Sequence, residues 1–118
     1  MDYERAKEYI LAKPEAKELH PSGADQPVFK VCHKLFATLA EEDGAPFVNL
    51  KCDPDWALEL RDNYPGIEPG RRMNKVHWNT VILDGSVPEE LVRELIDHSY
   101  ERVIENLPES DQQRLRTQ

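Results

Sequence analysis

Residues 69 to 83 of the chain read PGRRMNKVHWNTVIL. From Met73 to Leu83 this stretch is rich in β-branched and aromatic residues, which predicts a strand. Two-residue alternation gives that strand two faces, with Val76, Trp78, Thr80 and Ile82 on one and His77, Asn79, Val81 and Leu83 on the other. Because both faces are apolar near its end, we expect the strand to lie in the interior of a sheet.

The sequence on either side predicts the elements that surround this strand. An edge strand at 16–20 followed by a loop to residue 27, a hairpin of strands at 28–32 and 34–39, and a strand at 47–51 precede it, with helices expected at 3–13, 54–63 and 87–106. The segment between Pro65 and Pro69 is expected to be a tight, stiff loop. A hairpin-rich order with helices at both ends and one in the middle predicts an α+β fold, a two-layer α/β sandwich in which helices pack on a mostly antiparallel sheet.

Three polar residues mark the expected helix starts. Asp2 is placed to cap the first helix, and Asp53 followed by Pro54 is a strong start for the second. Ser86, with Glu89 three residues later, predicts a capping box for the third helix. Pro108 ends that helix, so we expect residues 1–108 to form a single domain and residues 109–118 to be a polar tail, one helical turn that then frays.

The charge balance restricts the partners that the domain can bind. The 118-residue chain has a net charge of −8, whereas nucleic-acid affinity depends largely on neutralising phosphates. Between Val28 and Asn79 seven Lys and Arg residues stand against eight Asp and Glu residues, so the middle is near neutral and the flanks hold the excess negative charge. Binding to DNA therefore requires a local basic face with the acidic residues turned away.

Several features predict a cytoplasmic location without a membrane anchor. No apolar run approaches the ~20 residues that span a bilayer, and the N-terminus lacks the apolar core of a signal peptide. The two cysteines, Cys32 and Cys52, are too few for a disulfide scaffold, and we expect both to be thiols buried as small hydrophobic residues.

Six ordered blocks carry a resemblance to a known family, and together they extend over nearly the whole chain. They are residues 28–31 (VFKV), 34–37 (KLFA), 48–54 (VNLKCDP), 64–70 (YPGIEPG), 73–81 (MNKVHWNTV) and 95–100 (LIDHSY). On these blocks the chain resembles the MmcQ/YjbR-like family. The resemblance implies a double-wing α/β sandwich, related in shape to the frataxin-like fold. It also implies DNA binding, because the family is similar to the DNA-binding domain of a phage transcription factor.

The sequence departs from the family pattern at two places. Cys32 and His33 stand where the family commonly has a pair of glycines, so a different turn type is expected in the first hairpin. Arg71 and Arg72 stand where an aromatic residue and a histidine are common, which adds positive charge to the central stretch.

The DNA-binding interpretation assigns contacts to one loop and one hairpin. Cations before the central strand would hold phosphates of double-stranded DNA, an amide would contact bases, and hairpin cations would contribute from an adjacent wing. The candidate nucleic-acid-binding residues are Lys30, Lys34, Arg71, Arg72, Asn74 and Lys75. Structural roles compete with this interpretation: Trp78 suits a core, Asn74 and Asn79 suit turns and strand ends, and the two arginines suit pairing with Glu68 or with helix acids.

Two other classes of function remain open. A small-ligand or protein-interaction module would use a pocket near Lys75, His77 and Trp78, with an apolar wall and a few polar anchors. An enzyme is not expected, because the four histidines lack metal-site spacing and because Asp97, His98 and Ser99 point in different directions on a helix. Iron binding by analogy with frataxin would need an acidic ridge, and a solvated N-terminal face explains the acids there better. We therefore expect no metal, no cofactor and no catalytic residues.

Overall fold

A six-stranded antiparallel sheet in the order β1-β2-β3-β4-β6-β5 forms one layer of the protein, which is described by a computed structural model over residues 1–21 and 26–118. The strands are β1 (Lys17–Leu19), β2 (Val28–Val31), β3 (Lys34–Glu42), β4 (Ala45–Lys51), β5 (Ile67–Pro69) and β6 (Trp78–Ile82). The helices are α1 (Tyr3–Leu11), α2 (Pro54–Asn63), α3 (Glu89–Ile104) and α4 (Glu109–Arg116). Residues 22–25, in the loop expected before β2, lie outside the described part.

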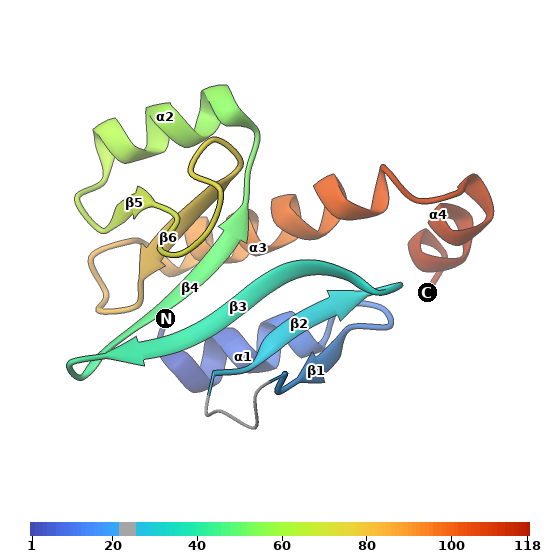
Figure 1. Cartoon of the computed structure of the whole chain (residues 1–118), viewed down its shortest axis with the longest axis horizontal. Helices are drawn as coiled ribbons and strands as arrows, with labels where there is room; N and C mark the ends of the chain where they lie inside the picture. The colour runs from blue at the N-terminus through green and yellow to red at the C-terminus, as the bar shows by residue number, and fades with distance from the viewer. Residues whose placement is uncertain (22–25) are drawn as a thin grey trace.

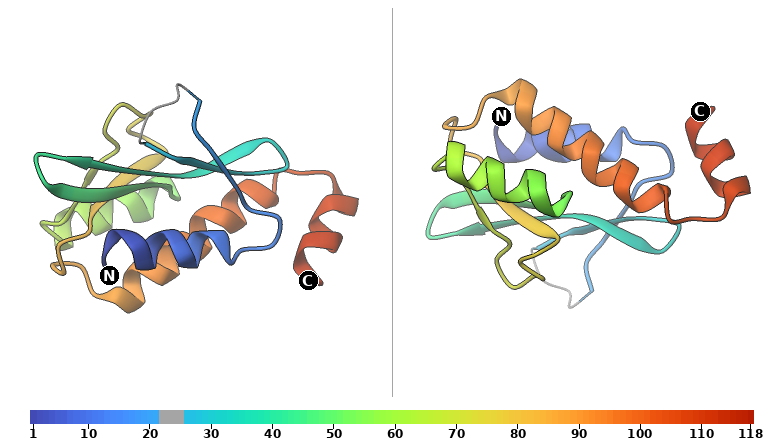
Figure 2. Two further views of the ribbon diagram at one scale, coloured as in Figure 1. Left: turned by 90° about the horizontal axis from the view of Figure 1, so that it is seen from below. Right: turned by 90° about the horizontal axis from the view of Figure 1, so that it is seen from above.

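The helices α1, α2 and α3 cover one face of the sheet, and the other face is open (Figures 1 and 2). Val48 and Leu50 on β4 point into the core beneath these helices, where they meet Ile96 of α3. Phe47 and Asn49 alternate with them and point to the open face. The predicted α+β sandwich with a mostly antiparallel sheet is confirmed.

The first hairpin keeps a tight turn without glycine. Cys32 and His33 both have positive φ, at 47° and 66°, which is the backbone of a two-residue type I′ connection. L-residues disfavour this region, so the turn carries steric strain that a pair of glycines would not. The next hairpin, between β3 and β4, turns at Asp43 and Gly44, with φ of 52° and 78°.

The predicted strand from Met73 to Leu83 is shorter than expected. Regular pairing begins only at Trp78, and residues 70–77 form a loop. The reason is local: Asn74 Oδ1 accepts hydrogen bonds from the N–H groups of Val76 at 2.9 Å and His77 at 3.2 Å, which bends the chain away from a ladder. Part of the expected loop before it is instead the short edge strand β5, which pairs with β6 and leaves β6 in the interior of the sheet.

Two of the three predicted helix caps are confirmed. Asp2 accepts from the N–H of Arg5 at 2.9 Å, and Asp53 accepts from the N–H of Trp56 at 3.0 Å. The predicted Ser86 capping box is wrong. Helix α3 begins one residue after Pro88, which has no side-chain cap, and the N–H of Ser86 instead donates to Asp84 in the preceding turn.

The tail is a helix, and the expectation of one frayed turn is wrong. Helix α4 runs over eight residues and is anchored by Leu115, which is 2 % exposed. Arg114 pairs with Glu15 at 2.8 Å, and Arg116 pairs with Glu101 on α3.

Among the residues that the structure describes, none of the helices combines the length and the hydropathy that crossing a bilayer requires.

Candidate functional site

Two buried polar side chains fix the start of the loop at residues 70–77. Thr80 on β6 is fully buried, and its Oγ1 accepts from the backbone N–H of Arg71 at 2.8 Å and donates to Asn49 Oδ1 at 2.5 Å. Asn49 on β4 donates from Nδ2 to the carbonyl of Arg71 at 3.3 Å. Both backbone groups of Arg71 are therefore bonded to side chains of the sheet. The sequence analysis placed Asn49 and Thr80 in strands but did not predict that they bind the backbone of Arg71.

Further contacts hold the rest of the 70–77 loop against β6 and α2. Gly70 packs so closely on β6 that an added Cβ would lie 2.8 Å from Cβ of Trp78, so only glycine fits there. The ammonium group of Lys75 donates to the carbonyl of Gly70 at 2.8 Å and closes the loop on itself. Arg61 on α2 donates to Asn79 Oδ1 at 2.6 Å and also to the carbonyl of Lys75. These contacts fix the conformation of the 70–77 loop.

The two arginines of this loop share one carboxylate. Glu42, at the end of β3, lies 2.8 Å from Nη1 of Arg72 and 3.4 Å from Nη1 of Arg71. Arg71 also donates from Nε to Glu68 at 2.6 Å, and its guanidinium lies over the ring of Phe47 at 4.7 Å from the centroid. The hydrogen bond with Glu68 raises the pKa of Arg71, which stays charged. The expected pairing with Glu68 is confirmed, and the second partner is a strand residue and not a helix acid.

The predicted nucleic-acid-binding residues lie in three places. Arg71, Arg72, Asn74 and Lys75 come together in the 70–77 loop. Lys30 lies on β2, where alternation with the buried Phe29 and Val31 points it to the open face. Lys34 is exposed at the start of β3, at the far end of the first hairpin.

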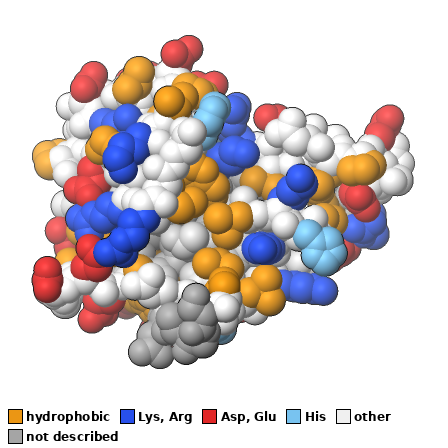
Figure 3. Space-filling model, viewed as in Figure 1, with side chains coloured by type: hydrophobic (Ala, Val, Ile, Leu, Met, Phe, Trp, Pro, Cys, Tyr) orange, Lys and Arg blue, Asp and Glu red, His pale blue; other side chains and the backbone are white. Residues whose placement is uncertain are grey.

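Two of these residues already use their polar groups inside the loop. The carbonyl oxygen of the Asn74 side chain is occupied by its turn, and the ammonium of Lys75 is bonded to Gly70. Arg72 is the most available cation of the loop, since its side chain is 73 % exposed. In Figure 3 lysine and arginine side chains are spread across the middle of the open face among hydrophobic ones, and most acidic side chains lie toward the rim.

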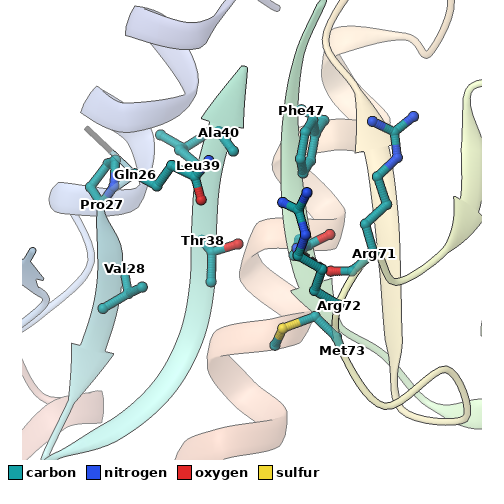
Figure 4. A pocket seen from close by; sticks show the side chains of 11 residues that line it. Gln26, Pro27, Val28, Thr38, Leu39, Ala40, Phe47, Arg71, Arg72 and Met73 are labelled. Carbon is teal, nitrogen blue, oxygen red and sulfur yellow. Dashed lines mark hydrogen bonds between the residues drawn. The ribbon is translucent and has the colours of Figure 1, made fainter. Parts of the chain in front are cut away.

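A cleft of about 150 Å³ opens on this face beside the two arginines. Figure 4 shows Arg71, Arg72, Met73 and Phe47 on one side of it and residues of β2 and β3 on the other. It is lined by Gln26, Pro27, Val28, Thr38, Leu39, Ala40, Phe47, Asn49, Arg71, Arg72 and Met73. The sequence had pointed to a pocket near Lys75, His77 and Trp78. Trp78 is only 8 % exposed, as expected for a core residue, and the cleft lies at Arg71–Met73.

A larger cavity of about 640 Å³ lies on the helical side, where α3, α4 and the start of α2 meet. Its wall contains His98, whose Nε2 accepts from the N–H of Asp53 at 3.0 Å and whose ring meets Trp56 edge-on at 4.7 Å. Burial lowers the pKa of His98, so the ring is neutral at pH 7. Its neighbour Ser99 donates to the carbonyl of Phe36 at 2.5 Å, so these two side chains serve different parts of the structure.

The thiols do not form a reactive centre in this arrangement. Cys52 is buried, and burial raises the pKa of its thiol to about 11, so it is protonated at neutral pH. Cys32 is half-buried in the hairpin turn, with Nη2 of Arg114 3.5 Å from its sulfur. Within residues 1–21 and 26–118, no three His, Cys, Asp or Glu side chains are grouped to hold a metal ion.

Comparison with known proteins places the chain among bacterial relatives of similar length. The chain is 40% identical over 114 residues to the Escherichia coli O157:H7 protein YbdF, covering 97% of this chain and 93% of that one. It is 38% identical over 102 residues to YjbR of Escherichia coli K12, covering 86% of each. Both relatives are described as uncharacterised, so any activity has to be argued from the residues of this chain.

Solved structures with the same fold agree with these relatives. A crystal structure of a Deinococcus radiodurans protein, assigned to the domain family DUF419, superposes with a TM-score of 0.86 at 33% identity, over 95% of this chain and 86% of that one. A Pseudomonas syringae protein superposes with a TM-score of 0.79 at 28% identity, over 86% of this chain and 98% of that one. The family model described as YjbR matches residues 11–102, and the chain belongs to the YjbR family.

Proposed function

We propose that the protein binds the phosphate backbone of double-stranded DNA through the open face of its sheet. The observation that supports this most is that cations distant in sequence lie on the same face of the sheet. Arg71 and Arg72 reach it from the 70–77 loop, Lys30 from β2 and Lys51 from β4, where each lysine alternates with core residues. These four cations are our candidates for the local basic face that an acidic chain requires to hold phosphates.

Contact with the backbone suits this face better than stacking on bases. Sequence-tolerant binding to single strands uses exposed aromatic rings as platforms. The aromatic residues on this face of the described sheet, Phe47 and Trp78, are 2 % and 8 % exposed and offer no such platform. Phosphate contacts by lysine and arginine give binding that is independent of sequence and strongly dependent on salt.

The acidic groups set the expected strength of binding. The net charge is −8, and Glu42 and Glu68 already neutralise part of the arginine charge. We therefore propose weak binding, with a dissociation constant in the range of about 10⁻⁴ to 10⁻⁶ M that is typical of non-specific complexes at physiological salt. A protein with this role would be non-enzymatic and would act in the cytoplasm.

Fluorescence anisotropy with a labelled duplex, at salt concentrations from about 50 to 200 mM, tests the proposal. The variants Lys30→Gln and Arg72→Gln are expected to weaken binding to unrelated duplexes alike, and each is expected to lower the salt slope by about one. Arg93→Gln is the matched control, because Arg93 is a half-exposed arginine on α3, in the helical layer. Absence of binding at the lowest salt, or an equal loss in the control, would overturn the proposal.

Small-ligand binding is the second candidate function, and the cleft beside Arg71–Met73 favours it. A concave site with apolar walls and a few polar groups is the usual form of a small-molecule site. The cleft combines Val28, Ala40 and Phe47 with two guanidinium groups. Duplex binding and occupation of the cleft would share Arg71 and Arg72 but differ at Lys30, which belongs to the open face and does not line the cleft.

A further inference from the structure

We infer that the cleft beside the 70–77 loop binds a small organic anion, one carboxylate or phosphate group on a body the size of a single ring. The inference gives the second candidate function a ligand class, and it rests on that function and not on contact with DNA. The residues that carry it lie on β2, β3, β4 and the 70–77 loop, and all of them belong to the described part of the chain.

The charge of the lining selects an anion. Of the described residues that line the cleft, the charged ones are Arg71 and Arg72, and the polar remainder consists of the uncharged Gln26, Thr38 and Asn49. A guanidinium presents its donors in a planar fork that matches a carboxylate or phosphate group with two parallel hydrogen bonds. A cation in the same place would meet two positive groups, and Glu42 and Glu68 lie outside the lining.

The arginine side of the cleft is organised before any ligand arrives. Asn49 and Thr80 bind both backbone groups of Arg71, as described above. Arg72 follows with a φ of 61°, a left-handed conformation that an L-residue keeps only when its surroundings impose it. A backbone held in this way does not have to be ordered on binding, which lowers the entropic cost for a small ligand.

The remaining walls select an apolar body. Val28, Ala40, Phe47 and Met73 supply carbon surface around the polar groups. A volume of about 150 Å³ is close to that of cavities that accommodate a benzene ring. The polar groups and the apolar walls together fit an amphipathic anion better than inorganic phosphate, which would leave the apolar walls uncovered.

Glu42 is the shared counterion of the two cleft arginines. Its carboxylate bridges Arg71 and Arg72; among the described residues Oε1 is buried and accepts no hydrogen bond, whereas the side chain as a whole is 32 % exposed. A ligand anion has to share or displace this carboxylate to reach the two guanidinium groups. Removing its charge therefore strengthens ligand binding, which distinguishes a true anion site from a structural ion-pair cluster.

The test is a titration of the full chain, followed by two-dimensional NMR, with four probes: benzoate, phenyl phosphate, inorganic phosphate and benzyl alcohol. Benzoate and phenyl phosphate are expected to shift the signals of Thr38, Ala40 and Met73, and the other two probes are expected to bind more weakly. Glu42→Gln is expected to tighten benzoate binding about two- to five-fold, the size of a half-exposed ion pair, and Arg72→Gln is expected to weaken it.

The control for Glu42→Gln is Glu89→Gln, because Glu89 also bridges two arginines, Arg5 and Arg93, on the helical side. Equal tightening in both variants, equal binding of benzyl alcohol and benzoate, or shifts outside the cleft would overturn the inference. Lys30→Gln separates it from the DNA proposal, since that variant is expected to weaken duplex binding and to leave benzoate binding unchanged.

Discussion

Replacing Thr80 with valine tests the polar cluster that fixes the 70–77 loop. Valine is nearly the same size, so the fully buried site stays filled and only the hydroxyl is lost. That hydroxyl makes two hydrogen bonds, one from the N–H of Arg71 at 2.8 Å and one to Asn49 Oδ1 at 2.5 Å. Both partners would be left without it. At about 1 to 3 kcal/mol for each unsatisfied buried group, and with Arg71 only half-buried, we expect a loss of about 2 to 3 kcal/mol.

Urea unfolding of the Thr80→Val and Thr80→Ser variants measures this loss. Serine keeps the hydroxyl and removes one methyl group, which costs about 1 kcal/mol through lost apolar burial. Valine is therefore expected to destabilise the protein more than serine does, and only valine is expected to weaken benzoate binding at the cleft. If Thr80→Ser were the more destabilising change, packing and not hydrogen bonding would hold the loop.

Three further predictions concern stability away from the cleft. Replacing His33, which has a φ of 66°, with glycine is expected to raise the free energy of unfolding by about 1 kcal/mol in urea melts, and a decrease would show that the turn is not strained. Asp53→Ala removes the cap on the N–H of Trp56 and is expected to lower that free energy by about 1 kcal/mol, whereas no change in the thermal midpoint would count against the cap. Burial lowers the folded-state pKa of His98 below its ordinary 6.5, so the unfolded chain binds the proton more readily. The contribution of neutral His98 to the free energy of unfolding is therefore complete above pH 6.5 and is lost as the pH falls toward the folded-state pKa. The His98→Gln variant is expected to lose this part of the pH dependence of stability.

The parts of the fold that were predicted correctly depend on short-range chemistry. Asp53 followed by Pro54 favours a helix start, and the alternation of Val48 and Leu50 with Asn49 and Lys51 predicts a strand. The first hairpin was recognised from two β-like runs separated by Cys32 and His33. Each of these signals lies within a few residues.

The errors arose where a single contact decides between two local structures. The run from Met73 to His77 has strand-like composition, but the side chain of Asn74 bonds its own backbone and bends the chain. The tail is almost wholly polar, and helix α4 packs through one apolar residue, Leu115. The sequence therefore has no periodic apolar pattern that would predict this helix. The residue composition of a segment does not reveal such single contacts, so it predicts the wrong local structure there.

The candidate site shows the same division. Arg71 and Arg72 were identified because they are adjacent in the sequence and follow a proline-glycine turn. Arg71 pairs with Glu42, which lies 29 positions earlier in the sequence. The cleft also requires strands β2 and β4 to lie beside the 70–77 loop. Such proximity follows from sheet order, which local patterns do not encode. Asn49 was missed as a positioning residue for the same reason.

We propose the open face of the sheet as the binding surface of the protein. The most direct measurement is a titration of isotope-labelled full chain with a short duplex at low salt, followed residue by residue through the backbone amide signals. We expect shifts that cluster on β2, β4 and the 70–77 loop, including Lys30, Lys51 and Arg72, and that disappear as salt is raised. Shifts confined to α1 and α3 on the opposite side, or no shifts with a large excess of duplex, would contradict it.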